Sequence, residues 1–107
     1  MNLKIHISKE MITFRNDNDV LLEECKNNLS SPRILIQNVR QAEEFFREKC
    51  LKYSNKIVRP IVTLTIDENI FEDGLTNTEE RIIFHALIKN GARKLFYKDK
   101  KVGYEPF

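Results

Sequence analysis

Several residue types and patterns that mark particular protein classes are scarce or missing from this chain of 107 residues. It has no tryptophan, and its three glycines and three prolines are too few for a collagen-like or low-complexity disordered chain. No apolar stretch approaches the roughly 20 residues that a membrane-spanning helix needs. The first six residues contain no apolar segment of the signal-peptide kind. We therefore expect a cytoplasmic protein that does not contact a membrane.

The cysteines, histidines and net charge are also too few to mark a metal site or a nucleic-acid binder. Cys25 and Cys50 stand alone, with no Cys-x-x-Cys pair, and two histidines do not complete a zinc site. We expect two reduced thiols and no metal or cofactor. The formal net charge is only +2, and basic residues are interleaved with acidic ones, so nucleic acid is not an expected partner.

The residues that are present favour a single folded domain. Hydrophobic residues make up 41% of the chain and charged residues 32%, which is typical of globular proteins. The length suits one domain over residues 1–107, with a modest core that a partner surface would help to bury. We expect residues 102–107 to form a tail.

Alternation of apolar and polar residues predicts strands at the start of the chain. Residues 3–7 alternate in this way and predict a half-buried strand, and residues 11–15 predict a second strand that forms a hairpin with the first. Asn and Asp residues at positions 16–19 predict a turn. Residues 20–22 predict a short third strand, although the pattern there is weak.

Helical periodicity and capping residues predict two helices, each followed by a strand. Apolar residues recur at spacings of three and four over positions 39–53, with Asn38 as the N-cap. The dense apolar run at 61–66 predicts a central strand. A capping box at Thr76-x-x-Glu79 and a C′ glycine at Gly91 bound a second helix over 77–90. Residues 95–97 predict the last strand, and residues 98–101 a polar turn.

The predicted element order is β-β-(β)-α-β-α-β. This order favours an α+β domain with a hairpin-led mixed sheet and two helices, similar to the ribonuclease-H-like fold that underlies actin-type ATPases. The sheet would be a truncated one, since the closing helix of that fold is not expected after the last strand. A ferredoxin-like arrangement is the main structural alternative.

Several segments resemble bacterial actin-like ATPases of the rod-shape-determining kind. Arg59-Pro60 before the central strand, Gly74-Leu75-Thr76-x-x-Glu79-x-Arg81 at the helix start and Gly91-Ala92 after the helix each resemble a segment of that family. Those ATPases hold phosphate on the first hairpin through an Asp, a Gly and a Thr. Here the hairpin is Ser8-Lys9-Glu10. The resemblance therefore implies a degenerate actin-like scaffold without a phosphate-binding loop.

A closer resemblance is to the YjaA-type family of enterobacterial stress proteins. It is based on Ile12-Thr13-Phe14-Arg15, on Arg33-Ile34-Leu35-Ile36-Gln37-Asn38, and on Gly74-Leu75 followed by Glu79-Glu80-Arg81-Ile82. This resemblance implies a bacterial stress-response protein. The family offers no established chemistry to transfer.

The second predicted helix has more apolar surface than one sheet face requires. Its apolar residues cover roughly 240° of the helix, whereas a stripe of little more than about 100° is enough. Phe84 and Ile88 are left over, beside a polar stripe that includes Arg81 and His85. We interpret these four residues as a candidate interface. Either the tail, with Tyr104 and Phe107, or a homodimer or protein partner would cover the apolar pair.

The acidic residues leave one catalytic alternative open. Asp67 at the end of the central strand, together with Glu43 or Glu44 on the first helix, would hold the Mg²⁺ of a residual metal-dependent hydrolase. The first strand contains no carboxylate, so the set is incomplete and we expect no enzyme. The acidic residues at positions 67–73 then form a solvated loop, although ligands often bind at such a place in α/β sheets.

The main functional prediction is a non-catalytic interaction or stress-response protein that acts through protein contact. One alternative is an immunity or antitoxin-like protein that binds a cognate toxin through its exposed apolar face. A nucleic-acid binder would instead need several basic residues on one face. These residues are Arg33, Arg40, Arg93, Lys94 and Lys98.

Overall fold

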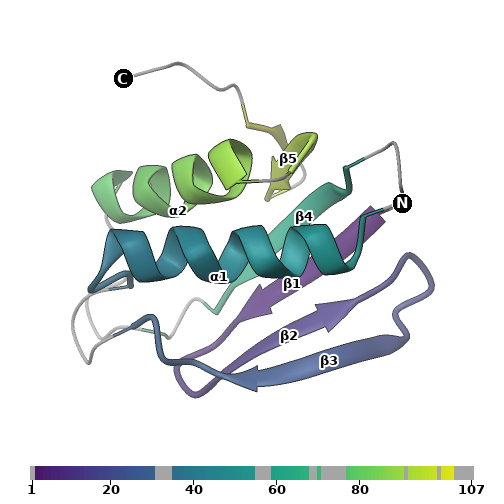
Figure 1. The fold of residues 1–107 in the computed structure, drawn as a ribbon, viewed down its shortest axis with the longest axis horizontal. Helices are drawn as coiled ribbons and strands as arrows, with labels where there is room; N and C mark the ends of the chain where they lie inside the picture. Colours follow the sequence, from purple (N-terminus) through teal and green to yellow (C-terminus); the bar gives the residue numbers. More distant parts are fainter. Residues whose placement is uncertain are drawn as a thin grey trace.

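A mixed β-sheet with two helices packed on one side organises the protein (Figure 1). The computed structural model describes residues 2–30, 35–54, 59–67, 70, 77–90, 92–98 and 100–102. The strand order is β3-β2-β1-β4-β5-β6. The elements are β1 (Asn2–Ile7), β2 (Met11–Arg15), β3 (Leu21–Lys26), α1 (Val39–Lys52), β4 (Ile61–Ile66), α2 (Asn77–Asn90), β5 (Lys94–Tyr97) and β6 (Lys100–Lys101).

The sheet has an antiparallel half and a parallel half that meet at β1. Strand β1 pairs antiparallel with β2, and β2 pairs antiparallel with β3. On its other side β1 runs parallel to β4, and β4 runs parallel to β5. The predicted α+β class, single domain and element order are thereby confirmed. The ferredoxin-like order, β-α-β-β-α-β, is not the order observed.

Three details of the predicted elements were incomplete or wrong. Strand β3 runs over Leu21–Lys26, well beyond the predicted short segment at 20–22. The first helix ends at Lys52, with Tyr53 as its C-cap. The polar turn predicted at 98–101 is wrong at Lys100–Lys101, which pairs antiparallel with β5 as β6. Two lysines give no apolar alternation, so the pattern carried no signal for this strand.

The cap of α1 is as predicted from the sequence. The side-chain Oδ1 of Asn38 accepts a hydrogen bond from the amide of Gln41 at 3.1 Å, which satisfies one of the free donors of the first turn. Helix α2 has the predicted bounds. Its predicted caps, Thr76 and Gly91, lie outside the described residues.

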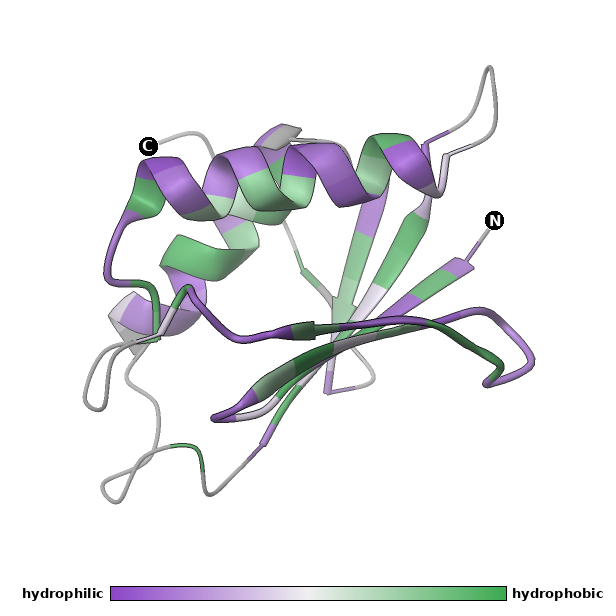
Figure 2. Cartoon of the chain, turned by 60° about the horizontal axis from the view of Figure 1, so that its bottom comes forward, coloured by the Kyte–Doolittle hydropathy of each residue, from purple (hydrophilic) through white to green (hydrophobic). Residues whose placement is uncertain are grey.

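The core lies between the sheet and the two helices. The buried strand residues all have one parity along their strands, as in Leu3, Ile5 and Ile7 of β1, so they share one side of the sheet. Figure 2 shows both helices on that side, above the strands. The helices contribute Ala42, Phe46 and Cys50 from α1 and Ile83, Ala86 and Leu87 from α2.

Aromatic contacts show which helix covers which part of the sheet. The ring of Phe14 on β2 lies 6.0 Å from the rings of Phe45 and Tyr53, so α1 covers the antiparallel half. The ring of Tyr97 on β5 lies 5.0 Å from the ring of Phe84, so α2 covers the parallel edge. Neither described helix is both long and apolar enough to span a membrane.

Candidate functional site: an uncovered sheet face

No described helix covers the face of the sheet opposite α1 and α2 (Figures 1 and 2). Register places Lys4 beside Thr63 on β4, and Thr63 beside Phe96 on β5. The next row has His6 between Thr13 and Thr65. These positions alternate with the buried ones, so their side chains lie on the side away from α1 and α2.

The parallel half of this face is unusual for a surface without a cover. All-parallel sheets occur almost only where both faces are covered, whereas antiparallel sheets often have one face in water. The open positions in the parallel half include Ile61, Thr63 and Phe96, which are half-buried. No described helix packs on them. These residues have the apolar and β-branched character of strands that normally receive a covering layer.

Two of the predicted interface residues, Phe84 and Ile88, pack against the core of the protein itself. Both are half-buried. Tyr97 forms the neighbouring wall, and its hydroxyl also donates to Oε1 of Glu80 at 3.3 Å. Sequence reasoning did not assign Tyr97 to this contact. The tail residues Tyr104 and Phe107, predicted as an alternative cover, lie outside the described residues.

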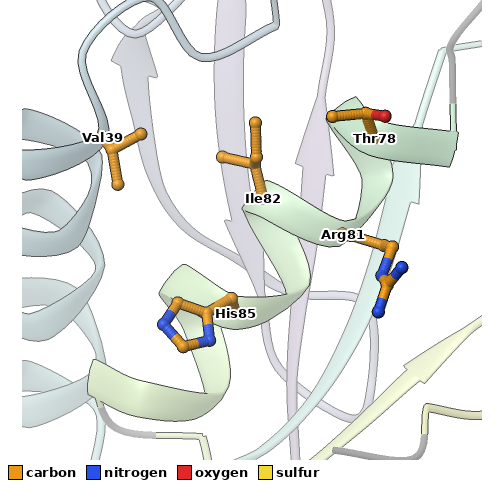
Figure 3. A pocket seen from close by; sticks show the side chains of 5 residues that line it. All are labelled: Val39, Thr78, Arg81, Ile82 and His85. Carbon is orange, nitrogen blue, oxygen red and sulfur yellow. The ribbon is translucent and has the colours of Figure 1, made fainter. Parts of the chain in front are cut away.

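The other two predicted interface residues, Arg81 and His85, line a small groove between the helices (Figure 3). Val39 of α1, which is 44% exposed, faces Ile82 of α2 across it, and Thr78 completes the lining. The groove has a volume of about 210 Å³. Ligand pockets usually span about 300–1,000 Å³, so this groove suits a single apolar side chain better than a small-molecule ligand.

A histidine–carboxylate pair lies where β1 and β4 end. Nε2 of His6 lies 2.7 Å from Oδ1 of Asp67, and both side chains are nearly half exposed. A cavity of about 380 Å³ opens at the ends of β4 and β5, with Thr65, Asp67 and Lys98 in its lining. This cavity therefore lies at the carboxyl ends of parallel strands, where ligands commonly bind in α/β sheets. Two ligating groups are still too few to hold a metal ion.

The structure does not bring together the carboxylates of the hydrolase alternative. Asp67 pairs with His6, whose side chain lies on the uncovered face. Glu43 is 3.5 Å from Lys89, and Glu44 is 3.4 Å from Arg40, both within the helical layer. Among the described residues, no group of three or more potential metal ligands is found. Glu68, Glu72 and Asp73 lie outside the described residues.

The β1–β2 hairpin contains no phosphate-binding loop of the actin type. The amide of Ser8 donates to the carbonyl of Met11 at 2.9 Å, and the amide of Met11 donates to Oγ of Ser8 at 3.1 Å. These amides therefore close the turn instead of pointing toward a bound anion.

The basic residues of the nucleic-acid alternative are divided between two sides of the protein. Lys94 has the parity of the uncovered face on β5 and Lys98 lies in the turn after it, whereas Arg40 lies on α1 in the opposite layer. Arg93 precedes β5, and Arg33 lies outside the described residues. The required single basic face is not formed by the described members of the set.

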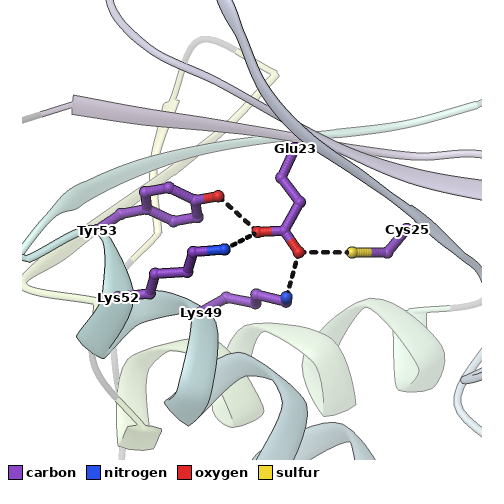
Figure 4. Close-up of polar contacts among 5 residues, drawn as sticks. All are labelled: Glu23, Cys25, Lys49, Lys52 and Tyr53. Atoms are coloured by element: carbon purple, nitrogen blue, oxygen red, sulfur yellow. Dashed lines mark hydrogen bonds and ion pairs between the residues drawn. The ribbon is translucent and has the colours of Figure 1, made fainter.

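A polar cluster that sequence reasoning missed joins α1 to the edge strand β3 (Figure 4). The carboxylate of Glu23 accepts hydrogen bonds from Lys49, from Lys52 at 2.8 Å and from the Tyr53 hydroxyl at 2.5 Å. Its Oε2 also accepts from Sγ of Cys25 at 3.1 Å. The sequence carried no clear signal for this cluster, because only the pairing of β3 with β2 places Glu23 and Cys25 opposite the core residues Phe14 and Ile12.

The contacts within the Glu23 cluster shift the pKa values of its members. Lys49, followed by Lys52 and Tyr53, holds the pKa of Glu23 well below its ordinary value of 4.5. Burial and the Glu23 carboxylate raise the pKa of both the Cys25 thiol and the Tyr53 hydroxyl. A thiol with a raised pKa is a poor nucleophile at neutral pH, so the cluster is a structural tie.

No family model matches the chain, and a search of curated proteins finds no significant match.

Proposed function

We propose that this protein is a non-catalytic interaction module that binds a protein partner across the uncovered face of its sheet. The observation that carries the proposal is the position of the two described helices on one side of a sheet whose parallel half is open on the other. A covering layer would bury Ile61, Thr63 and Phe96 and would give the parallel half the two-sided burial that is typical of all-parallel sheets. A protein surface meets this requirement better than a small ligand does.

The absence of catalysis is part of this proposal. Glu43 and Glu44 form ion pairs within the helical layer, while Asp67 pairs with His6 across the sheet. The Ser8 turn uses its amides internally, which supports a scaffold that no longer holds phosphate. A Mg²⁺ titration followed by NMR tests this part. A saturable shift at Asp67 that Asp67→Asn removes would contradict it.

The biological setting is proposed from the sequence resemblances. The resemblance to the YjaA-type stress proteins, together with that to a degenerate actin-like scaffold, suggests a bacterial stress-response role in the cytoplasm. Reducing conditions there would keep Cys25 and Cys50 as the free thiols seen in the structure. An immunity or antitoxin-like role would use the same face, with a toxin as the occupant.

Site-specific photo-crosslinking in cells tests the interaction surface. A photo-reactive amino acid at position 63 samples the centre of the uncovered face, and the matched control at Glu48 samples the exposed side of α1. We expect position 63 to give one discrete adduct, either with a second copy or with another protein identified by mass spectrometry. Equal labelling from both positions, or no adduct at position 63, would overturn the proposal.

A further inference from the structure

We propose that the partner presents an acidic amphipathic helix that lies across β1, β4 and β5 on the uncovered face. This inference rests on the proposed function, because it names the chemistry of the partner that covers the face.

The parallel half of the uncovered face carries two apolar side chains with positive charge beside them. Phe96 and Ile61 supply apolar surface at half-buried positions. Lys94 lies on the same side of β5 as Phe96, and Lys98, in the turn after β5, lines the cavity that Thr63 and Thr65 also line. Both lysines are exposed. Neither lysine forms an ion pair with another described residue, although Nζ of Lys98 lies 5.4 Å from the centre of the Tyr97 ring. A partner with apolar residues flanked by carboxylates matches this pattern.

The other charged residues of the face do not neutralise Lys94 and Lys98. Lys4 forms an ion pair with Asp19 at 2.8 Å, and Nε2 of His6 lies 2.7 Å from Oδ1 of Asp67. Lys94 and Lys98 therefore remain as charges that a partner can neutralise. Glu24, the other carboxylate with the parity of the face, lies on β3 at the far edge of the sheet.

A second copy of the chain fits the face poorly. Two identical faces packed together would each bring two unpaired lysines, whose like charges oppose close packing. Single-stranded nucleic acid also fits less well. Among the described residues of the face, Phe96 and His6 are the aromatic side chains, whereas nucleic-acid platforms combine several stacking rings with a positively charged groove.

The sheet edges favour a helix over an added strand. Strand β6 is only two residues long, which leaves little backbone to pair with. At the other edge, β3 carries Glu24 and Lys26, and its register with β2 shifts between Phe14 and Arg15. Charges and irregular register both discourage pairing with another strand. The broad face is therefore the better surface, and helices are the elements that usually cover parallel strands.

Synthetic peptides test this inference on the intact chain. The probe is an 18-residue helical peptide with leucines on one face and glutamates elsewhere, and its control replaces every glutamate with lysine. Two-dimensional NMR maps the binding surface. We expect the acidic peptide to shift the amide signals of Lys4, Thr63 and Phe96, and the lysine peptide to leave them unchanged.

Charge reversal tests the role of the flanking lysines. Lys94→Glu should weaken binding of the acidic peptide by about fivefold at low salt, as expected for one exposed charge contact. Arg40→Glu, on the helical side, should leave the affinity unchanged. Lys98→Glu provides a second test on the face. All three positions are exposed, and a dispersed amide spectrum confirms that each variant is folded.

The outcomes separate this inference from the proposed function. A crosslink at position 63 without binding of the acidic peptide, or with equal binding of both peptides, overturns the acidic helix and leaves the interaction module standing. The absence of both crosslink and peptide binding overturns both. Shifts on this face with a single-stranded RNA oligonucleotide, but not with the acidic peptide, would assign the surface to nucleic acid and overturn the inference.

Discussion

The Tyr53 hydroxyl donates a hydrogen bond of 2.5 Å to Oε1 of Glu23, although 30 residues separate them in the chain. Tyr53 caps the C-terminal end of α1, and Glu23 lies on β3 at the edge of the sheet. The same carboxylate accepts from Lys49 and Lys52, so one side chain ties the last turn of the helix to the edge strand. Glu23 is 20% exposed and Lys49 is 11% exposed, so solvent screens this ion pair less than a surface pair.

The Glu23 tie should make stability depend on pH in the acidic range. Its carboxylate has a lowered pKa in the folded protein, so its contribution is present above the ordinary value of 4.5 and is lost as the pH falls. We expect Glu23→Gln to lower the free energy of unfolding by about 1–3 kcal/mol at pH 7. This difference should shrink steadily between pH 5 and pH 2. Urea titrations at several pH values measure it.

A neighbouring carboxylate provides the matched control for this prediction. Glu24 is exposed and has the parity of the opposite side of β3. Glu24→Gln should change stability by no more than about 0.5 kcal/mol at any pH in the range. A loss in Glu23→Gln that is the same at pH 7 and pH 3 would show that the ionised cluster is not its cause.

The Cys50 thiol should report on unfolding of the core. Burial raises its pKa to about 11, and the side chain lies within the core cluster. In a Cys25→Ser background, we expect Cys50 to react with a thiol reagent at pH 8 at least about a hundredfold more slowly than in guanidinium-unfolded protein. Fast labelling of the folded protein would mean that this part of the core opens readily.

Phe84 and Tyr97 should be energetically coupled. Their ring centres lie 5.0 Å apart at an interplanar angle of 59°, a favourable arrangement for two aromatic rings. A double-mutant cycle with Phe84→Leu and Tyr97→Leu should give a coupling free energy of about 0.5–1.5 kcal/mol. Coupling near zero, combined with weaker self-association in Phe84→Leu, would favour the original assignment of Phe84 to an interface.

The Asn38 cap should contribute measurably to α1. Asn38→Ala removes the acceptor for the Gln41 amide and should cost about 0.5–2 kcal/mol of unfolding free energy. Asn38→Asp and Asn38→Ser keep a side-chain oxygen that can accept this hydrogen bond, and should retain most of the unfolding free energy that Asn38→Ala loses. If all three variants lose the same amount, the hydrogen bond is not the source of the effect.

Most elements could be predicted because each depends on neighbours in the sequence. The alternation over 3–7 and 11–15 and the run at 61–66 became β1, β2 and β4, and the periodicity after Asn38 became α1. Strand β6 could not be predicted, since its two lysines form a strand only because β5 lies beside them. The extent of β3 was missed for a similar reason, because Glu23 and Cys25 lack the pattern of a simple core strand.

The sequence by itself determined the α+β class, the order of the elements up to β5 and the Asn38 cap, because these follow from residue spacings over a few positions. Only the tertiary structure decided that both described helices lie on one side and that Tyr97 packs against Phe84. It also decided that Glu23 meets Lys49, Lys52 and Tyr53. These contacts join residues 13 to 30 positions apart, and their geometry depends on how the whole sheet twists and packs. The uncovered face was likewise decided only by the tertiary structure.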